Sequence, residues 1–383
     1  MGVTLCCGTA MDVIRELRNR GEVLSGMSRV ALRAPTPWVH DRWTKREFDS
    51  DAWVWYRPSH ALPLDVLVPT NVDRIRMRDV NCYECTAKLP PESIIWLDAT
   101  SSVVCPELLF VQMASRLSLP AAVMLGHELC GHFSRDVQNP LFGDVRMDLP
   151  AATSVGQIAS YIDALGRYRG TRRARRVLSY VADHAVSAPE AVLSTTCSLP
   201  ACESGYGVGA VTLNERIIVT EEATDEDVAK ANARRSRYPD LLFSFAPVGI
   251  NYDGQEHLDL DGLVHAARQE VLLSGEELFA AKVKTDGLAL GIREKVLDDI
   301  HRNNELMSRG YAVMVATKED LESGKALDAF MRRLLECAHH TFGTDITNAM
   351  NSLDDTSMAR DRASLLSQIH PQSGSVQPRR RTF

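Results

Sequence analysis

Two aspartates in the second half of the chain carry the clearest chemistry in this sequence. Asp240 precedes one short apolar run and Asp253 ends another, and a turn at Ala246-Pro247 separates them. This pattern predicts a β-hairpin in which the two aspartates lie directly opposite each other on one face. Carboxylates that close repel each other unless a cation lies between them, and paired oxygen ligands suit Mg²⁺. The spacing therefore predicts a magnesium site at Asp240 and Asp253.

Alternation along the predicted strands assigns the neighbouring side chains to two faces of the hairpin. Leu242 and Asn251 share the face of the two aspartates. Four residues of opposite parity point into a core: Leu241, Phe243, Ile250 and Tyr252. Aspartates at strand ends also commonly serve turns, so a structural role for the pair stays open. His257, four residues beyond Asp253, is either a proton carrier or a polar loop residue.

The composition limits the classes of function. With 383 residues the chain has room for two domains, and its 45% hydrophobic and 24% charged content is ordinary for a globular protein. The formal net charge of −7 leaves no global basic field, so any contact with nucleic acid must come from local patches. No apolar run approaches the roughly 18 residues that span a bilayer, and we expect no signal peptide. Nine cysteines with scattered spacing favour reduced thiols in a cytoplasm.

Hydrophobic periodicity and capping signals predict helices and strands on both sides of a domain boundary near Asp183. The predicted helices span about residues 9–20, 106–117, 121–130, 189–199, 288–300 and 324–340. Strands are predicted at 65–69, 94–97 and 311–316, in addition to the hairpin. From about residue 345 the chain becomes polar, which predicts a disordered tail.

The segment from Gly166 to Arg176 is dense in arginine. Four of its guanidinium groups are candidates for contacts with the phosphates of DNA: Arg172, Arg173, Arg175 and Arg176. A solvated helix face before the domain boundary explains the same residues equally well. Both interpretations stay open at this point.

Two other motifs have the residue types of a metal site without its spacing. His127 and His132 flank Glu128 as in a zinc-peptidase helix, but they are five residues apart rather than four. Five residues rotate a helix by about 140° beyond a full turn, so both imidazoles cannot face one metal. Cys82 and Cys85 form a lone C-x-x-C pair, whereas a zinc ribbon needs two pairs. We therefore interpret both motifs as structural.

Beyond the boundary, an ordered set of residues resembles a known superfamily. Glu190 lies early in a helix, Tyr238-Pro239-Asp240 opens a strand, and the next strand ends in the segment from Asn251 to His257. A helix carrying Asp299 and Arg302 then precedes the last strand. This set resembles the restriction-endonuclease-like proteins of the PD-(D/E)xK type, in particular the branch of the very-short-patch-repair endonucleases. There the second strand usually ends Glu-x-Asp-Gly-x-x-His.

The resemblance implies an α/β, mixed α+β architecture with two domains. Residues 1–183 would form a mixed domain with a regulatory or DNA-binding role. Residues 184–345 would form a restriction-endonuclease-like domain, with a central mixed sheet flanked by helices and an insertion at about 258–295, followed by a disordered tail at 346–383. It also implies a Mg²⁺-dependent DNA endonuclease of repair, restriction or phage defence. Its catalytic residues would be Glu190, Asp240, Asp253 and His257, with Arg302 contacting DNA.

One position departs from the pattern of the family. Asn251 is a neutral amide where the family has a metal-binding glutamate. This departure favours a second hypothesis, in which the domain binds DNA or a protein partner without cutting. The looser resemblance of the first half to abortive-infection antitoxins suits such a regulatory role. A third hypothesis, an interaction module with no nucleic-acid role, fits the net charge of −7.

Overall fold

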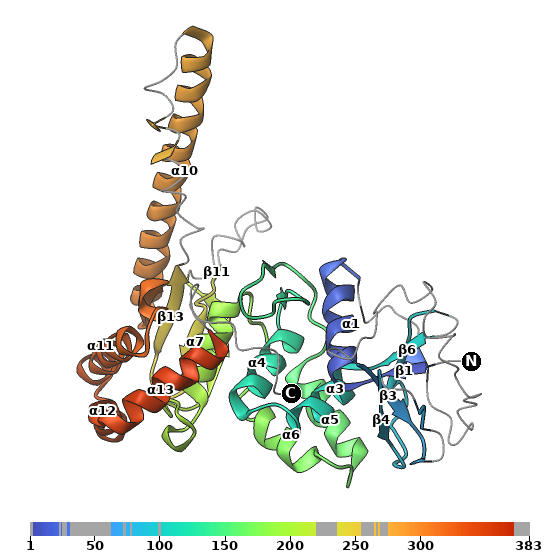
Figure 1. Ribbon diagram of the computed structural model, residues 1–383. Coiled ribbons are helices and arrows are strands. Elements are labelled where there is room, and N and C mark those ends of the chain that lie inside the picture. Colours follow the sequence, from blue (N-terminus) through green and yellow to red (C-terminus); the bar gives the residue numbers. More distant parts are fainter. Residues whose placement is uncertain are drawn as a thin grey trace, which may run out of the picture. The chain divides into compact units, whose positions relative to one another are not determined.

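A computed structural model describes residues 3–22, 24, 29–30, 63–71, 74–76, 79–98, 101–219, 236–253, 264–265, 267–268 and 275–370. The chain divides into two compact units, one containing Met1–Thr195 and the chain from Ser367 onward, the other Thr196–Leu366. The division falls inside one helix, α7 (Ala188–Ser198). Both units combine helices with mixed sheets, which confirms the predicted α/β class (Figure 1). Among the described residues, no helix has the length and apolar character needed to cross a membrane.

The first unit is built on a six-stranded sheet in the order β2-β5-β6-β1-β3-β4. Its strands are β1 (Val3–Leu5), β2 (Arg29–Val30), β3 (Leu64–Val68), β4 (Val80–Glu84), β5 (Ile94–Trp96) and β6 (Ser101–Val104). β1 runs parallel to β6 and β3 runs parallel to β4, whereas the other neighbours are antiparallel. The central strands β1 and β6 are buried along their whole length, as expected for strands covered on both faces.

The helices of the first unit begin at residues with the expected capping chemistry. They are α1 (Cys7–Asn19), α3 (Pro106–Ala114), α4 (Leu119–Cys130), α5 (Val155–Leu165), α6 (Thr171–Leu178) and most of α7. α3 starts with proline at its first position, as predicted, and the hydroxyls of Ser118 and Ser154 accept backbone N–H groups at the starts of α4 and α5. A small ribbon, β7 (Ser134–Arg135) with β8 (Val145–Arg146), follows α4.

The second unit contains a four-stranded sheet in the order β14-β13-β12-β9. Its strands are β9 (Val211–Leu213), β12 (Leu241–Phe243), β13 (Val248–Asp253) and β14 (Ala312–Thr317). β12 is antiparallel to both of its neighbours, whereas β13 and β14 run parallel and are connected through a helix. The same unit contains a separate two-stranded antiparallel ribbon of β10 (Ile217–Ile218) and β11 (Ser236–Arg237).

The connecting helix, α10 (Gly275–Ser308), is 34 residues long and extends well beyond the sheet of its unit (Figure 1). It starts inside the predicted insertion and continues through the predicted helix at 288–300. The apolar stripe predicted there is not a core face, because Val296 is 39% exposed and Ile300 is 49% exposed. Among the side chains of α10 that the structure describes, Leu306 near the end of the helix is the buried one. A period of 3.6 residues correctly predicted a helix, but it could not indicate what covers the helix.

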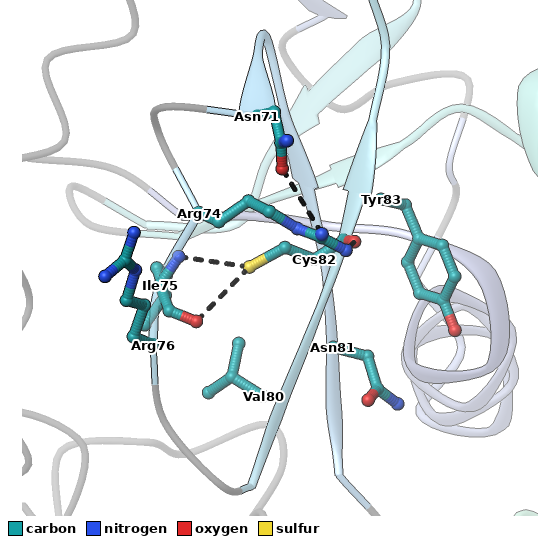
Figure 2. A pocket seen from close by; sticks show the side chains of 8 residues that line it. All are labelled: Asn71, Arg74, Ile75, Arg76, Val80, Asn81, Cys82 and Tyr83. Carbon is teal, nitrogen blue, oxygen red and sulfur yellow. Dashed lines mark hydrogen bonds between the residues drawn. The ribbon is translucent and has the colours of Figure 1, made fainter.

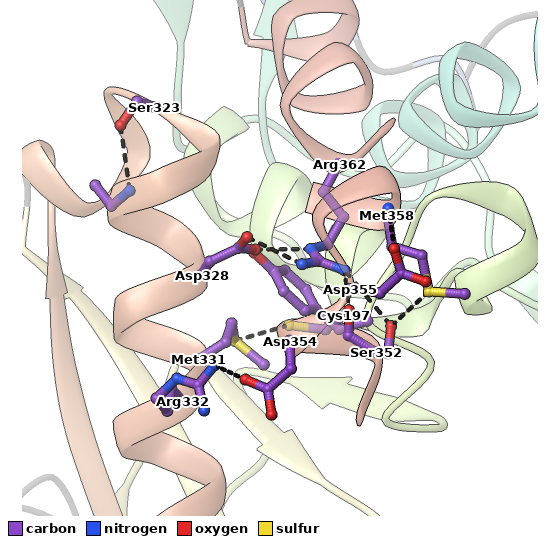
Figure 3. A network of polar contacts seen from close by, with 12 residues as sticks. Cys197, Ser323, Asp328, Met331, Arg332, Ser352, Asp354, Asp355, Met358 and Arg362 are labelled. Atoms are coloured by element: carbon purple, nitrogen blue, oxygen red, sulfur yellow. Dashed lines mark hydrogen bonds and ion pairs between the residues drawn. The ribbon is translucent and has the colours of Figure 1, made fainter. Parts of the chain in front are cut away.

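The prediction of a disordered tail from residue 346 is wrong for most of that segment. α11 (Gly324–Phe342) is followed by α12 (Thr347–Asp354) and α13 (Thr356–Ile369). The guanidinium of Arg362, 3% exposed, donates to both carboxylate oxygens of Asp328 at 2.7 and 3.0 Å and to the carbonyl of Ser352 at 3.0 Å (Figure 3). Tyr206 also donates to Asp328, at 2.7 Å. These partners are distant in sequence, so the polar composition alone could not reveal the packing.

Candidate functional site

The hairpin exists, but its register differs from the prediction by two residues. Leu241 pairs with Ile250 and Leu242 pairs with Gly249, so the turn is centred on Phe245-Ala246 and Asp240 lies beside Asn251 rather than opposite Asp253. A shift of two residues leaves every side chain on its predicted face, because the side-chain period of a strand is two. Asp240 precedes β12 and Asp253 ends the antiparallel β13, so the two aspartates lie at the same end of the hairpin without forming the predicted cross-strand pair.

Asn251 links the hairpin to α10. It is 1% exposed, and its amide oxygen accepts the backbone N–H of Asp240 at 3.3 Å. Its amide nitrogen donates to the side-chain oxygen of Asn303 on α10 at 3.2 Å. Asp240 in turn accepts the backbone N–H of Tyr252 at 2.5 Å. The neutral amide at the position of the family's glutamate thus holds the backbone of Asp240 and the helix together.

The end of α10 presents polar side chains to this part of the sheet. Arg302 forms an ion pair with Asp299 at 2.9 Å, and the two side chains are 27% and 29% exposed. The Nε of Arg302 is buried and has no hydrogen-bond partner among the described residues. One helical turn further, Leu306 packs with Leu242 in an apolar cluster that anchors the helix. The predicted ion pair of Asp299 and Arg302 is therefore present, half-buried rather than on an open surface.

Arg237, the last residue of β11, forms ion pairs with two carboxylates of α10. Its guanidinium contacts Asp298 at 3.1 Å and Glu305 at 2.5 Å. Burial lowers the pKa of Arg237, but the hydrogen bond to Glu305 and the charge of Asp298 outweigh it and raise the pKa overall. The sequence showed no signal for this contact, because the partners are more than 60 residues apart.

The described residues supply two carboxylates for a cation at this end of the hairpin, Asp240 and Asp253. Asp253 is half-buried at the end of β13, in register with Thr317 of β14. Mg²⁺ commonly binds through one or two carboxylates together with phosphates and water, so this donor set suits it. No group of three or more acidic, histidine or cysteine side chains among the described residues could hold a metal ion. The predicted proton carrier, His257, lies outside the described residues.

Glu190, the third predicted acid, belongs to the first unit and serves the start of α7. Its carboxylate accepts the backbone N–H of Val186 at 3.0 Å and the hydroxyl of Ser187 at 2.8 Å. The Ser187 hydroxyl also accepts the backbone N–H of Glu190, at 3.4 Å. This reciprocal arrangement resembles a capping box, which stabilises the first turn of a helix. Capping accounts for the burial of Glu190, which is 6% exposed.

The arginine run forms α6, and its four candidate residues have different environments. Arg173 donates to the carbonyls of Ala114 at 2.6 Å and Leu117 at 2.9 Å, so it binds the end of α3. Arg175 forms an exposed ion pair with Asp163 at 2.8 Å. Arg172 and Arg176 are exposed on the same helix. Arg173 is therefore a structural residue.

The motif around Glu128 is structural, as predicted from its spacing. His127 is fully buried with its Nδ1 3.1 Å from the carbonyl of Ala182, and burial lowers its pKa to about 4. His132 instead has its Nε2 3.4 Å from the Nδ1 of His184. The two imidazoles of the motif thus have separate partners. All nine cysteines, including Cys82 and Cys85 of the C-x-x-C pair, are free thiols.

Glu128 itself is the centre of a buried charge network. Its carboxylate binds Arg15 through two hydrogen bonds of 2.8 Å. Arg135 donates its backbone N–H at 3.0 Å and its Nε at 2.9 Å to the same carboxylate. Arg18 donates to the carbonyls of Glu128 and Gly131 at 2.6 and 2.8 Å. Although burial raises the pKa of Glu128, the charges of Arg15 and Arg135 outweigh it and hold the pKa far below its usual value.

Comparisons with known proteins add no relative: no protein-family model matches this chain, and no curated protein or solved structure matches it significantly.

Proposed function

We propose that the second unit is a nuclease-like domain that acts on the phosphodiester bonds of DNA. The observation that carries the proposal is the polar site described above: Asp240 precedes β12 and Asp253 ends the antiparallel β13, so both lie at one end of the hairpin, where Asn251 is hydrogen-bonded to Asn303 of α10. This arrangement agrees with the family resemblance of the ordered motif. The nine free thiols suit a reducing cytoplasm as the place of action.

In this proposal Asp240 and Asp253 hold Mg²⁺, and the chain positions DNA around them. Bound there, Mg²⁺ supplies Lewis-acid polarisation of a phosphate. Arg302 contributes a partly exposed guanidinium, and its ion pair with Asp299 fixes its orientation. His257 carries a proton to or from the reacting oxygens.

Nicking of supercoiled plasmid DNA in Mg²⁺ or Mn²⁺ tests the proposal. Asp240→Asn and Asp253→Asn remove one charge each at nearly constant size, and we expect each to lower the rate at least about 100-fold, as loss of a group that stabilises the transition state does. Asp361→Asn is the matched control, because Asp361 is an exposed carboxylate on α13 of the same unit. Activity that survives Asp240→Asn would remove Asp240 from the mechanism.

The buried amide of Asn251 favours a second candidate function, DNA binding without cleavage. Both polar atoms of that amide are occupied by Asp240 and Asn303, so Asn251 does not replace the missing acid. In this case the wild-type protein binds DNA in a salt-dependent manner and nicks no plasmid with either metal. Arg172→Gln and Arg176→Gln would each reduce the salt dependence by about one phosphate contact.

Asn251→Asp separates the two candidates, because it restores an acid at almost unchanged volume. If the missing charge is what prevents cleavage, the variant gains metal-dependent nicking that the wild type lacks. If the wild-type protein already cleaves DNA, the DNA-binding candidate is excluded directly.

A further inference from the structure

A cavity of about 580 Å³ lies in the first unit beside β4, the edge strand of the six-stranded sheet (Figure 2). One wall is the segment that precedes β4, and the other is the strand itself. The described lining residues are Asn71, Arg74, Ile75, Arg76, Val80, Asn81, Cys82 and Tyr83. Two of them are arginines and none is acidic, so the described lining carries positive charge.

Neither guanidinium of this cavity is neutralised by a carboxylate of the described residues. Arg74 donates to the side-chain oxygen of Asn71 at 3.2 Å and to the carbonyl of Cys82 at 3.1 Å, and both acceptors are neutral. Arg76 is exposed and makes no hydrogen bond or ion pair with a described residue. Figure 2 shows its side chain directed away from the strand, whereas Arg74 reaches across it.

The carboxylate of Asp65, on the neighbouring strand β3, already accepts two hydrogen bonds. One carboxylate oxygen of Asp65 accepts the side-chain N–H of Asn81 at 3.1 Å, and the other accepts the backbone N–H of Gly8 at 3.0 Å. Asp65 therefore caps the start of α1 and orients Asn81, and neither of its hydrogen bonds involves Arg74 or Arg76. The positive charge of the cavity remains available to a ligand.

The segment that carries both arginines is attached to the strand between them. The backbone N–H of Ile75 donates to the sulfur of Cys82 at 3.2 Å, and the thiol donates back to the carbonyl of Ile75 at 3.7 Å. Two contacts on the central residue hold Arg74 and Arg76 at a defined distance from β4. A site ordered before binding loses less entropy when a ligand arrives.

We propose that this cavity binds a phosphate group, with Arg74 and Arg76 as its cationic ligands. The planar guanidinium forms paired, charge-assisted hydrogen bonds with phosphate oxygens. The volume exceeds that of phosphate alone and is in the range of sites for whole small molecules. Ile75 and Val80 also line the cavity beside the arginines, and the ligand class that we assign to it is a nucleotide, either free or within a DNA strand.

Titration of the full-length protein with three probes tests the proposal: inorganic phosphate, dAMP, and a 12-nucleotide single-stranded DNA with a fluorescent label. We expect Arg74→Gln and Arg76→Gln each to weaken binding of the best probe at least about tenfold, as loss of a charge-assisted hydrogen bond does. Arg20→Gln is the control, because Arg20 is an exposed arginine in the same unit whose partner is Glu16. Thermal unfolding verifies that each variant is folded.

The result also identifies the source of the phosphate. Equal or tighter binding of dAMP indicates a free nucleotide, whereas much tighter, salt-dependent binding of the oligonucleotide indicates a DNA strand. If no probe binds, or if both variants bind as well as the wild type, the proposal is overturned. The inference does not rest on the nuclease-like site.

Discussion

Two polar clusters of this protein contain similar charged groups but differ in how deeply those groups are buried. In the first unit, Glu128 is 1% exposed and both of its carboxylate oxygens are bound by arginines. In the second unit, Asp253 and Arg302 are partly exposed, and the Nε of Arg302 has no partner among the described residues. A buried carboxylate whose oxygens are both bound by guanidinium groups holds a fold together, whereas partly exposed charged side chains remain within reach of a ligand.

The comparison also shows that the residue types of a sequence motif do not by themselves identify a functional site. The histidine-glutamate motif has the residue types of a catalytic centre, yet the structure uses it to join α1, α4 and the following ribbon. The hairpin of the second unit is less conspicuous in the sequence, yet it brings acidic and amide side chains together with α10. Four substitutions test this contrast.

Glu128→Gln should have the largest effect on stability. It leaves the guanidinium groups of Arg15 and Arg135 buried without a counter-charge, and breaking a buried ion pair in this way costs about 3–5 kcal/mol. All five tryptophans lie before residue 97, so unfolding in urea followed by tryptophan fluorescence reports on the first unit. Glu16→Gln removes an exposed ion pair and should change stability by only about 0.5 kcal/mol. If Glu128→Gln lowered the free energy of unfolding by less than about 1 kcal/mol, Glu128 would not be the stabilising centre of its cluster.

The second prediction concerns the pH dependence that His127 gives to the first unit. Burial lowers the folded-state pKa of His127 from 6.5 to about 4, so the unfolded chain binds the proton more tightly. The stabilisation is complete above pH 6.5 and is lost as the pH falls through the folded pKa, by about 1.4 kcal/mol per pH unit in between. His127→Gln should therefore make the urea concentration at the unfolding midpoint depend less on pH between pH 6.5 and pH 4. An unchanged pH profile would show that His127 is not titrating as its burial requires.

Asn303→Ala should have a moderate effect on the second unit. It leaves the amide nitrogen of the buried Asn251 without its partner, and an unsatisfied buried donor costs about 1–3 kcal/mol. Circular dichroism during urea unfolding measures the loss, while the tryptophan signal of the first unit provides an internal reference. Asn304→Ala, at the exposed neighbouring position, is the matched control. Equal stability of the two variants would mean that the amide pair does not anchor α10.

Arg302→Gln should have the smallest effect on stability and a selective effect on DNA. Its half-exposed ion pair with Asp299 contributes at most about 1 kcal/mol. If Arg302 contacts a phosphate, the slope of log affinity against log salt falls by about one. Fluorescence anisotropy with a labelled duplex measures the slope, and Arg293→Gln, at an exposed position on the same helix, is the control. Identical slopes for both variants would remove Arg302 from the DNA contact.

Local signals predicted much of the fold. Proline at the first position placed α3, and apolar runs placed β3, β5 and β14. The register of the hairpin was missed by two residues, because turn residues indicate that a turn exists without specifying its centre. The helices after residue 346 were missed because Arg362 and Asp328 each look solvated when considered alone.

The sequence by itself determined the local features of this protein: where helices begin, where strands run, and that a hairpin connects Asp240 with Asp253. These features depend on interactions within a few residues, so spacing is sufficient to predict them. Only the tertiary structure decided that Glu128 serves packing, that Arg237 binds α10, and that Arg74 and Arg76 line a cavity whose described lining contains no acid. Those outcomes depend on which groups meet after the chain folds, and on whether burial leaves them satisfied.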